Sequence, residues 1–237
     1  MAHALTLENV ASGYGQHLVI RDVSLSIPEG VLAALIGPNG HGKTTLLRTV
    51  SGLVPCRAGS ISLHGERIDR MRPDEIVAAG IVHVPQGDLL FPEMTVLENL
   101  RMGAYLPGAA ALERQRLEEV FTLLPKLKER RGQTASTLSG GERRMVGIGR
   151  GLMAGGRLLM LDEPSLGLAP IVIDQIYAVI GALRASGRTI LIVEENATRI
   201  AELADHLYLL DNGRFAWSGT GAELMSRPEI LSTYLGG

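Results

Sequence analysis

The chain has 237 residues and a formal net charge of −2 at pH 7, which suits one large α/β domain or a core with a smaller inserted lobe. No block of five like charges offers the positive surface that a nucleic-acid backbone requires, so we expect no nucleic-acid partner. Cys56 is the single cysteine, which excludes an internal disulfide.

Short runs of β-branched and apolar residues predict strands in the first part of the chain. They lie at residues 5–10, 23–27, 31–37, 59–65 and 80–85. Continuous apolar runs such as VLAALIG are typical of strands that are buried on both faces of a sheet.

Between residues 95 and 156 the pattern changes to helical spacing, and no strand is evident. TVLENL opens with a Thr-x-x-Glu capping box, and ALERQRLEEVFTLL and MVGIGRGLM follow. Strand-like runs return at residues 157–162, 189–194, 206–211 and 213–219, the last two forming a predicted hairpin around Asn212 and Gly213. The sequence therefore predicts an α/β core that is split by a mostly helical insertion.

GPNGHGKT, at residues 37–44, matches the phosphate-binding pattern G-x-x-x-x-G-K-[ST] between a predicted strand and a predicted helix. Its backbone N–H groups are expected to surround phosphates, Lys43 to reach the β- and γ-phosphate oxygens, and Thr44 to bind Mg²⁺. A glycine-rich turn with an exposed lysine is the alternative. The residues expected to bind ATP here are Gly37, Pro38, Asn39, Gly40, His41, Gly42, Lys43, Thr44 and Thr45. His41 lies at a variable position of the pattern and is not expected to be a catalytic base.

RLLMLDEP, at residues 157–164, is a predicted strand that ends in two carboxylates. Asp162 is expected to hold Mg²⁺ through water. Glu163 faces a different direction because side chains alternate along a strand, and it is expected to act as the general base on the attacking water. A solvated turn is the alternative, but the phosphate loop favours the catalytic interpretation.

LSGGE, at residues 138–142, admits two interpretations. Ser139 and Glu142 could form a capping box that binds nothing. Alternatively, glycines at a helix N-terminus could bind a phosphate group.

LSGGE about twenty residues before LDEP, and downstream of a phosphate loop, resembles the signature sequence of ABC-type ATPases. Tyr14 in SGYG resembles the aromatic residue that stacks on adenine in that family. Gln86 in VPQG resembles its Q-loop glutamine, with catalytic and Mg²⁺-binding roles, and SLGLAP resembles its D-loop. The resemblance covers nearly the whole chain.

This resemblance implies an α/β fold with a P-loop NTPase (RecA-like) core, an N-terminal antiparallel β subdomain and an inserted α-helical subdomain. Residues 1–237 would form a single domain. Within it, residues 1–86 and 157–237 would be the core, and residues 87–156 the helical, signature-bearing subdomain.

The family also implies partners. Two ATPase subunits, identical or different, would enclose each ATP between the phosphate loop of one and the signature of the other, so Ser139, Gly140 and Gly141 would serve the partner's nucleotide. No apolar stretch approaches the ~18 residues of a membrane span. The chain is therefore expected on the cytoplasmic face of the membrane, docked onto permease subunits through Phe91, Met94 and Val96. An extracytoplasmic substrate-binding protein is implied indirectly.

FPEMTVLENL, TLSGGERRMVGIGRGLM and DEPSLGLAP resemble the branched-chain amino acid uptake subfamily. Two residues depart from the general pattern of the family. Ala169 replaces the usual D-loop aspartate, and Glu195 replaces the switch histidine. A carboxylate would be repelled by a triphosphate, so we expect Glu195 to turn aside or to pair with a cation.

The function predicted from the sequence is ATP hydrolysis in an importer of branched-chain or other hydrophobic amino acids. Uptake of urea or short amides is an alternative, because ATPases of such systems resemble this chain closely. Two further alternatives are an ABC ATPase that acts in DNA repair or translation, and a subunit that binds ATP without hydrolysing it, the latter because of Glu195.

Overall fold

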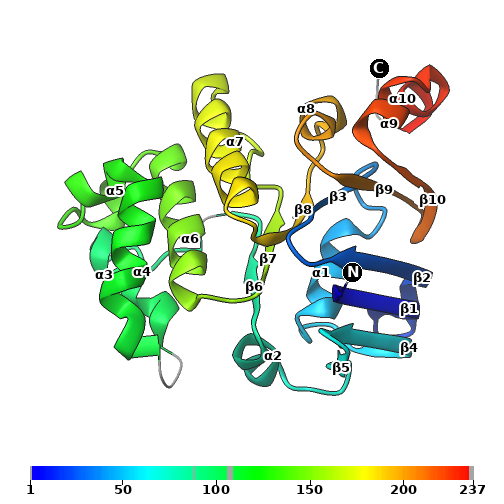
Figure 1. Ribbon diagram of the computed structural model, residues 1–237, viewed down its shortest axis with the longest axis horizontal. Coiled ribbons are helices and arrows are strands. Elements are labelled where there is room, and N and C mark those ends of the chain that lie inside the picture. Colours follow the sequence, from blue (N-terminus) through cyan, green and yellow to red (C-terminus); the bar gives the residue numbers. More distant parts are fainter. Residues whose placement is uncertain (1, 88, 106–108, 235–237) are drawn as a thin grey trace.

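A computed structural model describes residues 2–87, 89–105 and 109–234. Its order of elements is strand-rich at first, helical in the middle and mixed at the end. Two sheets and a group of helices build the molecule (Figure 1).

The smaller sheet is antiparallel, and its strand order is β2-β1-β4-β5. The members are β1 (His3–Tyr14), β2 (His17–Pro28), β4 (Cys56–Leu63) and β5 (Glu66–Arg67). β1 and β2 extend well beyond the runs predicted from the sequence. One face of this sheet is exposed, and the polar residues on that face interrupt the apolar pattern by which a strand is recognised. The short β5 was not predicted.

The larger sheet has the order β10-β9-β3-β8-β7-β6 and is parallel except for β10, which pairs antiparallel with β9. Its strands are β3 (Leu32–Ile36), β6 (Ile81–Val84), β7 (Leu158–Asp162), β8 (Thr189–Val193), β9 (His206–Asp211) and β10 (Arg214–Gly219). The predicted hairpin is confirmed, since Asn212 and Gly213 have φ angles of 46° and 77°.

Helices occupy the middle of the chain, as predicted. They are α3 (Val96–Arg101), α4 (Ala109–Leu123), α5 (Pro125–Glu129) and α6 (Gly140–Ala154), with 3₁₀ turns at Met102–Ala104 and Ala135–Thr137. Figure 1 shows this helical part in green on one side of β6 and β7, with the antiparallel sheet on the other side. The mixed α/β fold with an antiparallel β subdomain and helical insertion is thereby confirmed.

The remaining helices pack around the larger sheet. They are α1 (Lys43–Val50), α2 (Pro73–Ala79), α7 (Pro170–Ala185), α8 (Ala197–Ala201), α9 (Gly221–Met225) and α10 (Pro228–Tyr234). Alternate residues of the larger sheet enter two hydrophobic clusters. One cluster includes the antiparallel sheet and α1, and the other includes α7 and the helical part. The sheet is therefore buried on both faces, as its continuous apolar runs predicted.

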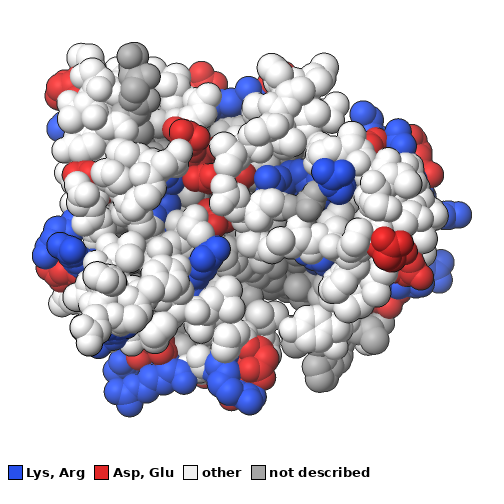
Figure 2. Space-filling view, turned by 180° about the vertical axis from the view of Figure 1, so that it is seen from behind, with Lys and Arg blue, Asp and Glu red and all other residues white. Residues whose placement is uncertain are grey.

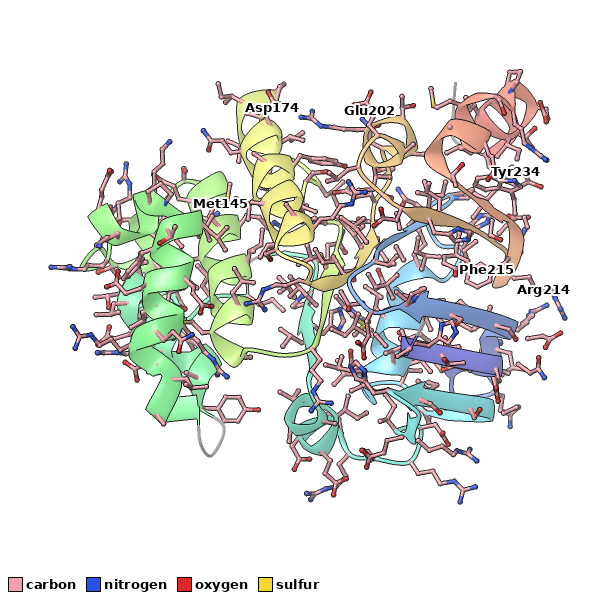
Figure 3. All side chains as sticks on the ribbon, viewed as in Figure 1. Met145, Asp174, Glu202, Arg214, Phe215 and Tyr234 are labelled. Carbon is pink, nitrogen blue, oxygen red and sulfur yellow. The ribbon has the colours of Figure 1, made fainter. Side chains whose placement is uncertain are left out.

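A groove of about 700 Å³ lies between α7 and the helices α4 to α6. Met145 of α6 lies on the side that faces α7 (Figure 3). Within the described residues, no helix is both long and apolar enough to cross a membrane.

Candidate active site

The phosphate loop connects β3 to α1, and its glycines adopt backbone conformations that other residues avoid. Gly40 and Gly42 have φ angles of 81° and 110°. Gly37 has a φ angle of 141°, and a Cβ atom there would lie 2.2 Å from the carbonyl oxygen of Leu210. The loop is therefore held against the end of β9 by a contact that only glycine permits.

Lys43 is 4% exposed, and its ammonium lies inside the loop. It donates hydrogen bonds to the carbonyl oxygens of Gly37 (2.8 Å) and Pro38 (3.1 Å) and to Asn39 Oδ1 (3.3 Å). Burial lowers the pKa of Lys43, while the charge of Glu163, 3.8 Å away, acts in the opposite direction. This buried cation, ringed by carbonyl oxygens, does not match the alternative of a glycine-rich turn with an exposed lysine.

Asp162 is the last residue of β7, and its carboxylate contacts the first turn of α1. The Thr44 hydroxyl donates to Asp162 Oδ1 at 3.0 Å, which brings together two residues that are 118 positions apart in the chain. Burial raises the pKa of Asp162, and the Thr44 hydrogen bond and nearby cations oppose that change.

Glu163 follows directly and is also buried, with Gln86 as its side-chain partner. Gln86 Nε2 donates to Glu163 Oε2 at 3.0 Å. Glu163 has a φ angle of 47°, a sparsely populated region for a residue other than glycine. Burial raises the pKa of Glu163, while the Lys43 charge lowers it. A raised carboxyl pKa suits a group that must accept a proton near neutral pH.

The oxygen atoms at this edge of the sheet fit Mg²⁺, a hard cation that prefers oxygen ligands. Thr44 and Asp162 supply two of them, and Gln86, whose amide nitrogen donates to Glu163, could offer its amide oxygen as a third. No cluster of three His, Cys, Asp or Glu residues within the described part of the chain could hold a metal by itself. A magnesium site here would therefore be completed by phosphate oxygens and water, as is usual for this ion.

Within the described part of the chain, the hydrogen bond of Glu195 is to an amide and not to a cation. Its Oε1 accepts from the side-chain amide of Asn39 at 3.1 Å. The charge of Glu195 still acts on Lys43, whose pKa it raises. Asn39 thus separates the two groups and binds both, and nothing in the sequence pattern indicated that amide.

Tyr14 ends β1 and is 46% exposed, so its ring is accessible for stacking. Arg48 of α1 donates to its hydroxyl at 3.4 Å. His41 points toward Asp211, with 2.8 Å between Nδ1 and Oδ1, which agrees with a bystander role. Thr45 is buried in α1, where its backbone carbonyl accepts from Thr49.

The signature LSGGE begins α6, on the opposite side of β6 and β7 from α1 (Figure 1). Ser139 is the N-cap, its hydroxyl accepts from the N–H of Glu142 at 3.3 Å, and Glu142 Oε2 accepts from the N–H of Ser139 at 2.9 Å. The capping box is therefore formed. Gly140 and Gly141 occupy the first helical positions, and a Cβ atom on Gly141 would lie 2.6 Å from Val172.

The segment after Gln86 carries exposed apolar residues beside α6. Phe91 is 43% exposed, and Arg150 of α6 lies over its ring and donates to the carbonyl of Leu89 at 3.0 Å. Met94 is half-buried. The expectation for Val96 was wrong, because Val96 is 0% exposed and its side chain enters the core just after the Thr95 N-cap.

Two residues near this segment were missed by the sequence interpretation. Tyr105 is 64% exposed and borders a cavity of about 180 Å³ that also contacts α6. Arg144 is buried and donates to the carbonyl of Gly87 at 2.6 Å. An arginine following the signature could have drawn attention, but the carbonyl that it binds lies 57 positions away.

Acidic and basic side chains are interspersed on the face of the molecule seen in Figure 2.

Comparison with known proteins places these features in a family. Residues 20–166 match the family model described as ABC transporter. The chain is 43% identical over 233 residues to the high-affinity branched-chain amino acid transport ATP-binding protein BraG of Pseudomonas aeruginosa, a match that covers 98% of this chain and 100% of BraG.

Two further similarities are informative. The lipopolysaccharide export system ATP-binding protein LptB of Haemophilus influenzae is 34% identical, with 98% of this chain and 97% of LptB covered. A crystal structure of the ADP conformation of an ATP-binding cassette from an ABC transporter has a TM-score of 0.85 and 32% identity, and covers 98% of this chain and 96% of that one.

Proposed function

This chain belongs to the ABC transporter family as an ATP-binding subunit with ATPase activity coupled to transport, and on that basis we propose that it energises the import of branched-chain or other hydrophobic amino acids. The observation that carries the proposal is the 43% identity to BraG over almost the full length of both chains. LptB, named for export, is less similar at 34%. The family membership sets aside an ATPase of DNA repair or translation.

We assign the nucleotide site to the residues around Lys43. The ammonium, now bound to loop oxygens 2.8–3.3 Å away, would turn to the β- and γ-phosphate oxygens. Thr44, Asp162 and Gln86 would hold Mg²⁺, which when bound neutralises charge on the transferred phosphoryl group. The exposed ring of Tyr14 would stack on adenine.

Glu163 would be the general base. Its carboxylate is oriented by Gln86 and lies beside Lys43, so it can accept a proton from the attacking water while the lysine steadies the phosphate. The raised pKa of Glu163 supports this role, because it brings the proton affinity of the carboxylate closer to that of a base working near neutral pH.

The signature would act on a second subunit. Subunits of this family dimerise and act with membrane permeases. The signature residues Ser139, Gly140 and Gly141 belong to the start of α6, and α6 lies on the other side of β6 and β7 from α1, which supports a role in trans. We propose that residues 1–86 and 157–237 form the core and residues 87–156 the helical subdomain. Phe91, Met94 and their neighbours would dock on the permease at the cytoplasmic face of the membrane.

The test is transport by the assembled system. The chain would be co-purified with the permease and ATPase subunits encoded beside it, and reconstituted in liposomes with the matching substrate-binding protein. We expect ATP-driven movement of leucine, isoleucine or valine from the side of the binding protein. Lys43→Ala should abolish both transport and ATPase activity in a complex that still assembles.

Three results would contradict the proposal. Movement of urea or an amide in place of amino acids would support the alternative substrate class, and movement in the reverse direction would indicate an exporter. Transport that persists with Lys43→Ala, when the partner ATPase alone is active, would make this chain an ATP-binding subunit without a catalytic role.

A further inference from the structure

Glu194 is a buried carboxylate that the proposed mechanism does not use. It follows β8 directly and is 1% exposed. Its backbone N–H donates to the carbonyl of Leu35 in β3 at 3.2 Å, which fixes its position at the edge of the sheet. Its Oε2 accepts a hydrogen bond from the hydroxyl of Ser165 at 2.9 Å, across 29 positions of the chain.

Burying this carboxylate is costly, and its environment only partly compensates. Glu194 Oε1 has no hydrogen-bond partner among the described residues. Burial raises the pKa of Glu194 to about 7. An apolar residue would be cheaper to bury there, so the hydrogen bond to Ser165 needs a functional explanation.

Ser165 belongs to the turn that holds Glu163 in its unusual conformation. Glu163, with a φ angle of 47°, donates its N–H to Val193 of β8 at 2.9 Å, and its own carbonyl accepts from Leu166 at 3.3 Å. Such a backbone conformation persists only where surrounding contacts over-determine it. Ser165 is two residues after Glu163 in this turn. Its hydrogen bond to Glu194, the residue directly after β8, therefore attaches the turn to the end of that strand.

We propose that Glu194 is a positioning residue that holds the catalytic carboxylate Glu163 in place through the hydroxyl of Ser165. One cavity of about 420 Å³ is lined by Glu163, Ser165, Glu194 and Glu195. Because Glu163 and Ser165 belong to the same turn, a shift of that turn would move Glu163 relative to Gln86 and Lys43. Glu194 itself does not contact Lys43 or Gln86 through any hydrogen bond in the described residues. This inference rests on the proposed role of Glu163 as the base.

The test is single-turnover hydrolysis and ATP affinity in the assembled transporter. Glu194→Ala should lower the rate about tenfold or more and leave ATP affinity within about twofold, because the phosphate loop is untouched. Glu194→Gln keeps an oxygen acceptor for Ser165 and should stay within about threefold of wild type. Ser165→Ala should reproduce the defect without altering a buried strand end, and Ser165→Thr should restore the rate.

Thr189→Ala is the matched control. Thr189 begins the same strand, is buried, and its hydroxyl accepts from the N–H of Gly30 at 3.0 Å, far from the site. It should leave the rate unchanged. The inference is overturned if Glu194→Ala slows hydrolysis no more than Thr189→Ala, if it weakens ATP affinity in proportion to the rate, or if Glu194→Gln is as slow as Glu194→Ala.

The Glu163→Gln background separates this inference from the proposed function. If Glu194 acts through Glu163, adding Glu194→Ala to Glu163→Gln should cause no further loss, and a further tenfold loss would overturn the inference. A Glu163→Gln subunit that keeps wild-type turnover would instead contradict the assignment of the base, and the role of Glu194 would fall with it.

Discussion

Two helices of this chain begin at glycine-rich sequences, but their first turns differ. The N-cap of α1 is Gly42, with no side-chain cap and no acidic residue in the first turn. The N-cap of α6 is Ser139, capped by its own side chain, with Glu142 in the first turn. No residue of α1's own first turn places a carboxylate at its N–H groups, whereas the first turn of α6 supplies one itself through Glu142.

This difference teaches that a helix start with glycines is not by itself an anion site. The α1 end brings a buried ammonium and two carboxylates to the same place. The α6 end is already partly neutralised by Glu142, whose pKa is lowered by the Ser139 backbone hydrogen bond. Alone, α6 should bind phosphate weakly, and it would require a nucleotide that another subunit holds.

The sharpest prediction places all bond-breaking at the α1 end. Glu163→Gln should lower single-turnover hydrolysis at this chain's nucleotide by at least about a hundredfold, because the base is lost while Gln86 keeps a partner. The measurement uses a complex whose other site is disabled by its own base mutation. Wild-type turnover there with Glu163→Gln would place the base elsewhere.

The second prediction concerns the α6 end. Ser139→Ala should slow hydrolysis of the partner's nucleotide by about ten- to a hundredfold, since one hydrogen bond to a charged phosphate is lost. ATP affinity of the isolated chain should not change. A lower ATP affinity of the isolated Ser139→Ala chain would contradict the proposed difference between α1 and α6, because Ser139 would then act on the nucleotide bound by the same chain.

A matched control separates capping from catalysis in that experiment. Thr220 and Glu223 form the same capping box at the start of α9. Thr220→Ala should cost a similar free energy of unfolding, about 1 kcal/mol, without slowing hydrolysis.

The third prediction concerns the α1 side of the molecule and the dependence of the free energy of unfolding on pH. His83 of β6 is half-buried beside the end of α1, with 2.9 Å between its Nδ1 and Ser51 Oγ. Burial, and then the charge of Arg48, lower the pKa of His83 from 6.5 to about 4. Between these values the unfolded chain binds a proton that the folded chain does not, so the free energy of unfolding falls as the pH falls.

Urea unfolding at pH 7.5 and pH 5 measures this effect. His83 should contribute a loss on the order of 1–2 kcal/mol at pH 5. His83→Asn, which does not titrate, should lose correspondingly less stability between the two pH values. An equal loss in wild type and variant would show that His83 is not responsible.

The smallest expected effect is at Glu195. Its carboxylate accepts from Asn39 at 3.1 Å, and a glutamine can keep that bond through its own oxygen. Glu195→Gln should therefore change single-turnover hydrolysis by less than about tenfold, or accelerate it slightly by removing a charge that repels phosphate. If Glu195→Gln lowered the rate of hydrolysis as much as Glu163→Gln does, the assignment of Glu163 as the general base would be wrong.

Much of the fold could be predicted because the chain marks its buried strands clearly. The runs that became β3, β7 and β8 are continuous and apolar, and each is fully buried. α7 was not predicted, because PIVIDQIYAVIGALRA is apolar around most of its surface and shows little periodicity. Val96 was misjudged for a related reason, since one apolar residue after an N-cap can face either solvent or the core.

The candidate site was predictable at the level of residues but not of contacts. The phosphate loop, LDEP and VPQG each carry local patterns, and the structure brings Thr44 to Asp162 and Gln86 to Glu163. The Asn39 amide that binds Glu195, the Glu194 bond to Ser165 and the Arg144 bond to Gly87 join residues that are 156, 29 and 57 positions apart. Such pairings depend on tertiary packing, and no local pattern reports them.

The Lys43 ammonium has three N–H groups, and each is directed at an oxygen of its own loop. Phosphate binding at this lysine, as proposed, would therefore be an exchange, in which an incoming oxygen replaces one that the protein supplies. The longest of the three bonds, 3.3 Å to Asn39, is the one expected to yield first. The same side chain donates its amide N–H to Glu195, so Asn39 connects the lysine and that carboxylate through its two amide atoms.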